Sequence, residues 1–418
     1  KKQIVSAWRQ YADDPMFQAD VGRRHTVSAL FALAYRHLLL DGDAIAMIHQ
    51  RETGPWRTQL RVVDPMLLDR PPEFASRPEV QSGIEIDDDG APLAYHLRQG
   101  WPDQHDPASM RFQRVARYDA QGRPQVVHYF RRQRDGQVRG VSRLAPVIEA
   151  FHMARRYADA ELSAAMLNAV LGLFVQSPHD ESLVDTLSDG GKLSDYQTMR
   201  SAYADRNPVV MDQVRINRLF PGESVEVAGQ RNLNNFKEFE TAVLRRVAAS
   251  FGQSYEQFAG DWSETNYSAM RAALLDVWRG WEADREQFAR GFCTPIYLRW
   301  LEEAVERGRI VPPEGTPGVM AAPAAWTRAK WIGPGRGFVD APKEQRASLE
   351  RVMMGMSTLE AETGQLTGRD LDEVQADLAA EIAETPAGII HPATRDWVEA
   401  FGRMPPDAAG DPDNTEGN

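Results

Sequence analysis

The first part of the chain changes from a helical to a strand-like pattern of hydrophobic positions. Val5, Trp8 and Tyr11, and then the apolar residues of 27–34, recur at the three- and four-residue steps of a helix. Asp41-Gly42-Asp43 breaks that pattern. Short apolar runs bounded by turns then predict strands at Ala44–His49, Gln59–Val63, Gly83–Ile86, Pro92–Leu97 and Gln125–Phe130, with turns at Asp89-Gly90 and Gln121-Gly122. Residues up to about 140 are therefore expected to form a mixed α+β region.

After Gly140 the helical spacing returns and continues for a long stretch. Apolar and alanine positions from Leu144 to Val170 trace one face of a helix of about 27 residues, or about 40 Å. Because this face is rich in alanine, a neighbouring helix could approach it closely. Pro178 and a polar stretch to Arg206 interrupt the pattern, and a short β-like region follows at Val209–Val227.

Two further helices are predicted in the middle of the chain. One begins at Asn234-Asn235, which are good N-cap residues, has Glu238 placed for a capping box, and ends at Gly252. A linker, Gln253–Thr265, separates it from a much longer helix that spans Tyr267–Arg307. Pro295 lies inside this long helix and should kink it, because proline cannot donate the helical hydrogen bond.

The last quarter of the chain mixes irregular and helical segments. Pro312–Gly337 is rich in proline and glycine and is expected to be irregular. Helices resume at Pro342–Gly355 and near Leu371–Glu384, and Met404–Asn418 has so few apolar residues that we expect disorder. A chain of 418 residues exceeds one ordinary core, so the sequence predicts a helix-rich α+β protein with about two or three regions.

Charge and cysteine content narrow the function classes. Lys and Arg total 48 and Asp and Glu total 60, a formal net charge of −12, so there is no general basic excess for gripping DNA. A protein of this charge that meets DNA is expected to let it pass. The single cysteine, Cys293, fits a reducing compartment, and nothing near Lys1 has the pattern of a signal peptide. The longest apolar run, Ala164–Val175, is too short to cross a membrane.

The signatures of common catalytic and cofactor sites are missing from the sequence. There is no phosphate-binding P-loop and no G-x-S-x-G nucleophile motif, and the nine histidines are scattered without metal-ligand spacing. Gly333–Gly337 is interpreted as an ordinary loop, Asp87–Gly90 as a hairpin turn and Cys293 as a buried small hydrophobe. We therefore expect no catalytic residues, no metal and no cofactor, and a protein that is not an enzyme.

Six short strings between Trp8 and Glu384 resemble, in the same order, the lambda family of phage portal proteins. The turn at Leu38–Ala44 resembles the family's "dGe" string with Asp43 in place of glutamate, and Arg139–Val147 resembles "rGvp.lapvl" with Ser142 where proline is frequent. The most distinctive string, Asn266–Leu275, is similar to "nYSsaRaall". The other three are Val62–Pro65, Gly83–Leu97 and Tyr157–Leu162.

The resemblance implies a portal fold, with wing, stem, clip and crown regions, assembled into a dodecameric ring around a central channel. The implied regions are wing 1–143, first stem helix 144–170, clip 171–233, second stem helix 234–252, tunnel loop 253–266, long wing helix and following irregular segment 267–340, crown helices 341–385, and a partly disordered tail 386–418. The residues expected near DNA are Gly260, Asp261, Trp262, Ser263, Glu264, Thr265 and Asn266.

The resemblance also implies a function and a set of partners. The ring would occupy the unique capsid vertex, pass double-stranded DNA non-specifically during packaging and ejection, and nucleate procapsid assembly. Its implied partners are further copies of the chain, the terminase large subunit, head-completion or neck proteins, and the major capsid or scaffolding protein. Assembly would take place in the host cytoplasm and the product would reside in the virion, with no membrane and with ATP hydrolysis left to the terminase.

Three alternatives remain open at the level of sequence. Asp261–Glu264 could be a plain helix–helix connection with Trp262 packed inward. The protein could be a monomeric adaptor that binds other proteins through its long helices, which its native mass would distinguish from a ring. It could also be a hydrolase or nuclease in which carboxylates such as Asp87–Asp89 bind a metal, which metal-dependent turnover would reveal.

Overall fold

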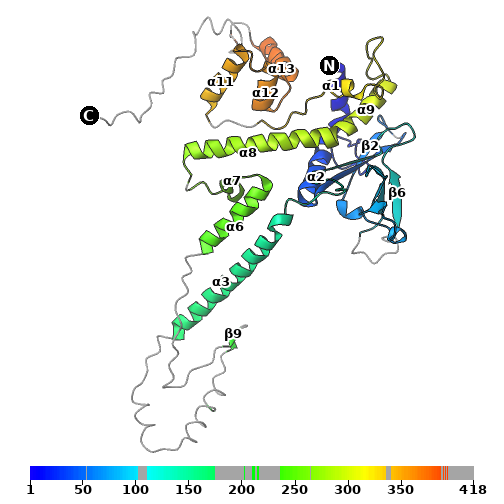
Figure 1. The fold of residues 1–418 in the computed structure, drawn as a ribbon. Helices are drawn as coiled ribbons and strands as arrows, with labels where there is room; N and C mark the ends of the chain where they lie inside the picture. The colour runs from blue at the N-terminus through cyan, green and yellow to red at the C-terminus, as the bar shows by residue number, and fades with distance from the viewer. Residues whose placement is uncertain are drawn as a thin grey trace, which may run out of the picture. The chain divides into compact units, whose positions relative to one another are not determined.

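The structure is a computed structural model of the whole chain (Figure 1). It describes residues 1–52, 54–101, 111–174, 236–263, 265–335 and 340–386, together with short pieces at 202, 210–211, 214–215, 389, 391 and 393. The chain divides into two compact units. The first unit contains Lys1–Leu38, Asp43–Arg139 and Asn266–Asn418, and the second contains Leu39–Gly42 and Gly140–Thr265. Each unit is considered by itself.

The first unit contains two antiparallel sheets. One has the order β2-β1-β7 and the other β3-β4-β5-β6. Ile45 of the central strand β1 pairs with Val63 on one side and His128 on the other. The strands are β1 (Asp43–Gln50), β2 (Thr58–Val63), β3 (Val80–Gln81), β4 (Ile84–Ile86), β5 (Pro92–Arg98), β6 (Phe112–Ala116) and β7 (Val126–Phe130).

All five predicted strands are present, and β3 and β6 are additional. These two strands have little apolar pattern to find. β3 has only two residues, and β6 buries Val115 alone, so its side chains do not alternate between an apolar and a polar face. Two short 3₁₀ turns, η1 (Pro65–Leu67) and η2 (Pro72–Phe74), lie between β2 and β3.

The main core of the first unit is aromatic. It forms where α1 (Lys2–Ala12) and α2 (Val27–Leu40) meet β1 and α9 (Thr294–Glu306). Trp300 is fully buried, and the ring of Trp8 meets it edge-on with centroids 4.9 Å apart. Tyr11, also fully buried, stacks on Trp300 at 5.8 Å. The two helices predicted at the start of the chain are thus confirmed. Their apolar side chains pack against residues near 300 in the aromatic core.

The long predicted helix is interrupted as expected, but ahead of the proline. It consists of α8 (Tyr267–Phe288), a π-helical turn η6 (Ala289–Cys293) and α9 (Figure 1). The backbone N–H and the hydroxyl of Thr294 both donate to the carbonyl of Ala289, the latter at 2.9 Å. Because Pro295 has no N–H, the wider turn lets the preceding residues complete their hydrogen bonds before the helix resumes.

Four helices end the described part of the first unit: α10 (Pro323–Trp326), α11 (Ala341–Met353), α12 (Leu359–Thr367) and α13 (Leu371–Glu384). The predictions for α11 and α13 are confirmed, whereas α12 was not predicted and α10 lies in a segment interpreted as irregular. The sequence of α12 is short and polar, and the helix begins because the Thr358 side chain accepts a hydrogen bond from the Ala361 N–H.

The second unit is built on two helices, α3 (Ile148–Phe174) and α6 (Phe236–Phe251), which lie side by side (Figure 1). Val147, Ala150, Val243 and Val247 form their small core. The helix α3 has 27 residues, but it begins four residues after Leu144 because a 3₁₀ turn, η4 (Ala145–Val147), precedes it. Two short strands, β8 (Val210–Met211) and β9 (Val214–Arg215), are described in the predicted β-like region, and Asn234-Asn235 lie outside the described residues.

Candidate functional site

The segment between α6 and α8 is an ordered pair of turns around a short helix, α7 (Tyr255–Ala259). Gly252 ends α6 with φ 67°, and Gly260 ends α7 with φ 68°. Nothing lies within 4 Å of a Cβ placed on either residue, so the left-handed backbone, not lack of space, favours glycine at both positions. Ser254 and Gln257 form a reciprocal capping box at the start of α7. The predicted plain linker therefore contains a helix.

Asp261 fixes the turn in the second half of this segment. The Asp261 carboxylate accepts hydrogen bonds from the backbone N–H of Ser263 at 3.1 Å and from its hydroxyl at 2.6 Å. These two bonds hold the pKa of Asp261 below its ordinary value. Residues 253–266 contain three acidic residues, Glu256, Asp261 and Glu264, and no lysine or arginine. The segment is therefore acidic.

Trp262 is neither fully buried nor fully exposed. Its side chain is 36% exposed, as is the nearby Phe258 at 37%, although the Phe258 ring stacks on Phe251 of α6 at 6.3 Å. Thr265 is half-buried and donates its N–H to the Trp262 carbonyl. Glu264 lies outside the described residues. The structure thus brings Gly260–Ser263 together as one exposed turn that presents an indole ring.

Asn266, the last residue predicted for this loop, has a local structural role. Its side-chain oxygen accepts a hydrogen bond of 2.8 Å from the Ala269 N–H and so caps the start of α8. This explains why the most distinctive family string begins with asparagine. The residue marks the point at which the chain passes from the second unit back to the first.

Among the residues that the structure describes, α3 exposes a row of large apolar side chains, which Arg155 interrupts. Its inner face packs on α6, where the rings of Tyr157 and Phe239 lie 4.5 Å apart. A second stripe, which we call the α3 stripe, lies about 100° around the helix, since each residue turns by about 100°. Its members are all well exposed, from 42% at Phe151 to 63% at Leu162. The α3 stripe consists of Ile148, Phe151, Leu162 and Met166.

Two strings of the family pattern meet in a buried charge network that the sequence did not predict. Asp43, which is 1% exposed, forms an ion pair with Arg139. Its carboxylate also accepts a hydrogen bond of 3.0 Å from His128 Nε2. Arg139 also donates to the carbonyls of Leu68 at 2.9 Å and Pro65 at 3.0 Å. Burial lowers the pKa of His128, so its imidazole is favoured in the neutral form.

The glycine next to this network is required by close packing. Gly42 has φ 92°, and a Cβ placed on it would lie 2.6 Å from the backbone nitrogen of Val141. The pairs Gly42–Asp43 and Arg139–Gly140 are far apart in sequence. In the first unit Asp43 contacts Arg139, and in the second unit Gly42 lies against Gly140. A signal for this contact was present, since both strings combine glycine with a charged residue, but sequence alone does not say that they touch.

The structure bears on three predictions made from the sequence, for Asp87–Gly90, Cys293 and Gly333–Gly337. Asp87 accepts hydrogen bonds from the N–H groups of Asp89 and Ala91, so Asp87–Gly90 is the turn between β4 and β5. Burial raises the pKa of the Cys293 thiol, which confirms a buried small hydrophobe. Gly333 to Gly335 form an irregular loop against the end of α12.

The described residues contain neither a candidate metal site nor a helix suited to cross a membrane. No group of three or more His, Cys, Asp or Glu side chains is arranged to hold a metal ion within the ranges that the structure describes. Across the same ranges, no helix combines the length and the apolar character needed to cross a membrane.

The solved structures that match the chain include two from gene transfer agent particles, both with low TM-scores. One is described as the neck of the native particle with C12 symmetry; it covers 87% of both chains with 15% identity and a TM-score of 0.33. Another, described as the virion of the native particle, covers 85% of this chain and 88% of that one with 17% identity and a TM-score of 0.31.

Similarity in sequence extends over nearly the whole chain. The portal protein of Escherichia phage N15 is 28% identical over 415 residues, which is 96% of this chain and 76% of that protein. Portal protein B of Escherichia phage lambda is 27% identical over the same shares. The model of the family described as phage portal protein, lambda family, matches residues 1–285. The chain belongs to the lambda family of phage portal proteins.

Proposed function

We propose that this portal protein forms the ring at the unique vertex of a capsid, through which double-stranded DNA enters during packaging and leaves during ejection. The observation that carries the ring is the α3 stripe, because four large apolar side chains exposed on one side of a long helix favour a protein partner there. In a ring each copy uses two different surfaces, so the stripe of one subunit would be covered by another face of the next.

The regions of the ring follow from the order of the elements. The wing would comprise 1–143 and the long helix and following segment 267–340, the stem helices 144–170 and 234–252, and the crown 341–385. The clip, 171–233, would dock the terminase large subunit and later the neck proteins, and it lies almost entirely outside the described residues. The tail would comprise 386–418. Contacts with capsid or scaffolding protein would let the ring nucleate procapsid assembly.

The charge of the proposed tunnel loop, 253–266, favours passage of DNA over tight binding of DNA. Its three acidic residues and lack of cations would repel phosphate, so the duplex would meet no salt-dependent barrier at each step. The exposed Trp262 would offer an uncharged surface beside the acidic turn. The ring would be structural, with ATP hydrolysis supplied by the terminase, assembly in the host cytoplasm and residence in the virion.

The proposal is tested by the native mass of the purified full chain and by negative-stain electron microscopy. We expect rings of about twelve copies with a central hole of duplex width. A monodisperse monomer at every protein and salt concentration would contradict the proposal and favour a monomeric adaptor. Incubation with divalent metal, ATP or DNA in the same preparation should give no turnover above buffer.

A further inference from the structure

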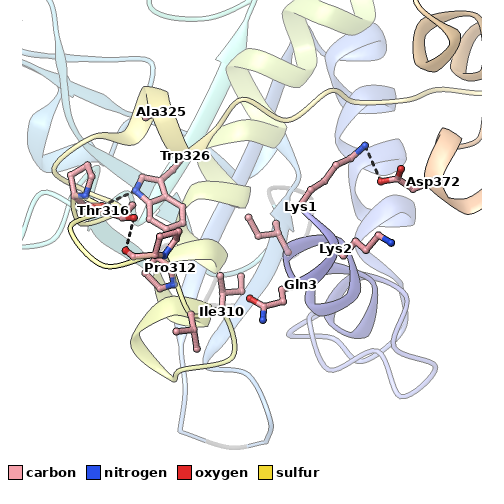
Figure 2. A pocket seen from close by; sticks show the side chains of 13 residues that line it. Lys1, Lys2, Gln3, Ile310, Pro312, Thr316, Ala325, Trp326 and Asp372 are labelled. Atoms are coloured by element: carbon pink, nitrogen blue, oxygen red, sulfur yellow. Dashed lines mark hydrogen bonds and ion pairs between the residues drawn. The ribbon is translucent and has the colours of Figure 1, made fainter.

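A groove crosses the first unit beside Trp326. On one side of this residue is a hollow of about 720 Å³, which Figure 2 shows between the first turn of α1 and the segment 310–326. Its walls are mostly apolar, with Ile310, Val311 and three prolines. The Trp326 indole is fixed in place because its N–H donates to the Pro317 carbonyl at 2.9 Å.

A second hollow of about 720 Å³ lies on the other side of Trp326. It is bounded by α1, α8, the loop 328–334 and the first turns of α12, and Trp278, Trp331 and Ile332 provide its apolar surface. Lys1, Ile4 and Trp326 line both hollows, so the two form one surface, which we call the Trp326 groove.

The Trp326 groove has more cations than unpaired carboxylates among the described residues. Its second hollow is lined by Glu282 as well as by Glu360 and Asp370. Lys1 is paired with Glu360, Asp370 and Asp372. In contrast, Arg285, Arg328 and Lys330 line the second hollow without any ion pair to the residues that the structure describes. Arg328 and Lys330 are exposed. In a chain of net charge −12, three such cations beside an indole-lined floor favour an acidic occupant with apolar side chains.

We propose that residues 399–418 of the same copy occupy the Trp326 groove. This segment lies outside the described residues, and its sequence has two blocks. The first block contains Phe401, Met404 and Pro405-Pro406, and the second contains Asp407, Asp411, Asp413 and Glu416. Prolines dock readily on aromatic grooves, and the acidic block matches the cations of the second hollow. The only base in the segment is Arg403.

The connecting chain is long enough for docking within one copy. Asp370, at the start of α13, lines the second hollow, and the 14-residue helix ends at Glu384, about 21 Å away along its axis. His391 lies back against α13, with its Nε2 3.6 Å from Glu381, which is about 16 Å along the axis from Asp370. Residues 392–398 then span up to about 23 Å when extended. Because the segment is tethered, its effective concentration at the groove of its own copy would be about millimolar, which favours that groove over a neighbour's.

The first test places a photo-crosslinking benzoylphenylalanine at position 401 of the full chain. After irradiation, peptide mass spectrometry should find crosslinks from position 401 to the segment 326–334 or to the first turn of α1. The same amino acid at Leu93, an exposed position on β5, should give none there. Crosslinks from position 401 only to other surfaces would overturn the proposal, as would crosslinks that join isotopically labelled to unlabelled copies.

The second test reverses the groove charges in the same crosslinking chain. The double change Arg328→Glu and Lys330→Glu should lower the crosslinked fraction by about fivefold or more, since two attractive pairs become repulsive. The matched control, Arg111→Glu with Arg134→Glu, changes two exposed arginines elsewhere in the unit and should have no effect. Adding Asp407→Lys and Asp411→Lys to the groove variant should restore crosslinking. A loss that these changes fail to restore would contradict the charge pairing and the proposal.

Discussion

One buried carboxylate joins two helices near the end of the first unit. Glu362 of α12 accepts hydrogen bonds from the Ser348 hydroxyl at 2.7 Å and from the Arg351 guanidinium at 2.9 Å. Arg351 and these hydrogen bonds outweigh burial and lower the pKa of Glu362 to about 2. Because the folded pKa lies below the ordinary 4.5, the ionised carboxylate stabilises the fold above pH 4.5, and this contribution is lost as the pH falls toward 2.

Glu362→Gln should therefore reduce the free energy of unfolding at pH 6 by about 2 kcal/mol. At pH 3 the difference from the unchanged chain should be smaller, since part of the carboxylate contribution is already lost. Urea unfolding at the two pH values measures both. Glu350→Gln, at an exposed position of α11, is the control and should change little at either pH. A difference that stays constant with pH would contradict the assignment.

Gly42 provides a second test at the scale of one residue. Gly42→Ala forces a side chain into a left-handed backbone and against the Val141 nitrogen, whereas Gly122→Ala meets the same backbone strain in open space. We expect Gly122→Ala to cost about 1 kcal/mol and Gly42→Ala about 3 kcal/mol, seen as a larger fall in Tm. Equal falls would show that the close approach to Val141 has no energetic weight.

At the scale of elements, the Asp43 network connects β1, β7 and η1. Asp43→Asn would leave the half-buried Arg139 without the carboxylate of fully buried Asp43, and breaking such a pair costs about 3 kcal/mol. Urea unfolding should show this loss, while Asp135→Asn, which removes the fully exposed partner of Arg132, should change stability by less than about 0.5 kcal/mol. If both variants unfold alike, the network is not a stabilising junction.

The elements that sequence predicted well are those that bury a regular apolar face. α1, α2 and β1 have such faces, and the structure buries them in the aromatic core. α12 was missed because it is stabilised by caps and by buried Glu362, which a hydrophobic pattern does not record. The start of α3 was placed four residues early because Leu144 and Val147 are apolar at helical spacing but belong to a 3₁₀ turn.

The ends of the helices on either side of the candidate site were predictable from the sequence, but the conformation between them was not. The two helix-ending glycines, Gly252 and Gly260, and the capping Asn266 have recognisable sequence signals. The helix α7 was missed because five residues with no buried side chain give no periodic pattern. The exposure of Trp262 depends on how the turn leaves α7, which no local sequence rule determines.

At the scale of the whole molecule, the α3 stripe leads to a prediction about assembly. Leu162→Asp places a charge in the proposed subunit interface, whereas Ala160→Asp places the same charge on an exposed face of the same helix. A buried, unpaired carboxylate costs at least about 2 kcal/mol, so each contact should weaken by about 30-fold in the first variant only. Native mass spectrometry should show rings lost for Leu162→Asp and kept for Ala160→Asp. If both variants form rings, the α3 stripe is not part of the subunit interface.

The acidic segment 253–266, which we propose as the tunnel loop, leads to a prediction about DNA. Asp261→Lys would place one cation per subunit in the channel, so duplex retention by assembled rings should rise by at least about tenfold at 50 mM salt. The gain should fall steeply by about 200 mM salt, because each phosphate contact releases counterions. Asp88→Lys, in the exposed β4–β5 turn, is the matched control and should not trap DNA. Filter binding at the two salt concentrations would distinguish them.

The stacking of Tyr11 on Trp300 has a consequence for synthesis of the chain. The ribosome makes α1 well before α9, and the indole that covers Tyr11 follows 289 residues later. At about 5 to 20 residues per second, the nascent α1 waits about 15 to 60 s with its aromatic face exposed. The second unit, by contrast, is nearly contiguous at Gly140–Thr265 and emerges complete during that interval. The helix α1 is therefore translated early but reaches its native contacts late, and in the interval its apolar side chains are a surface that chaperones would have to shield.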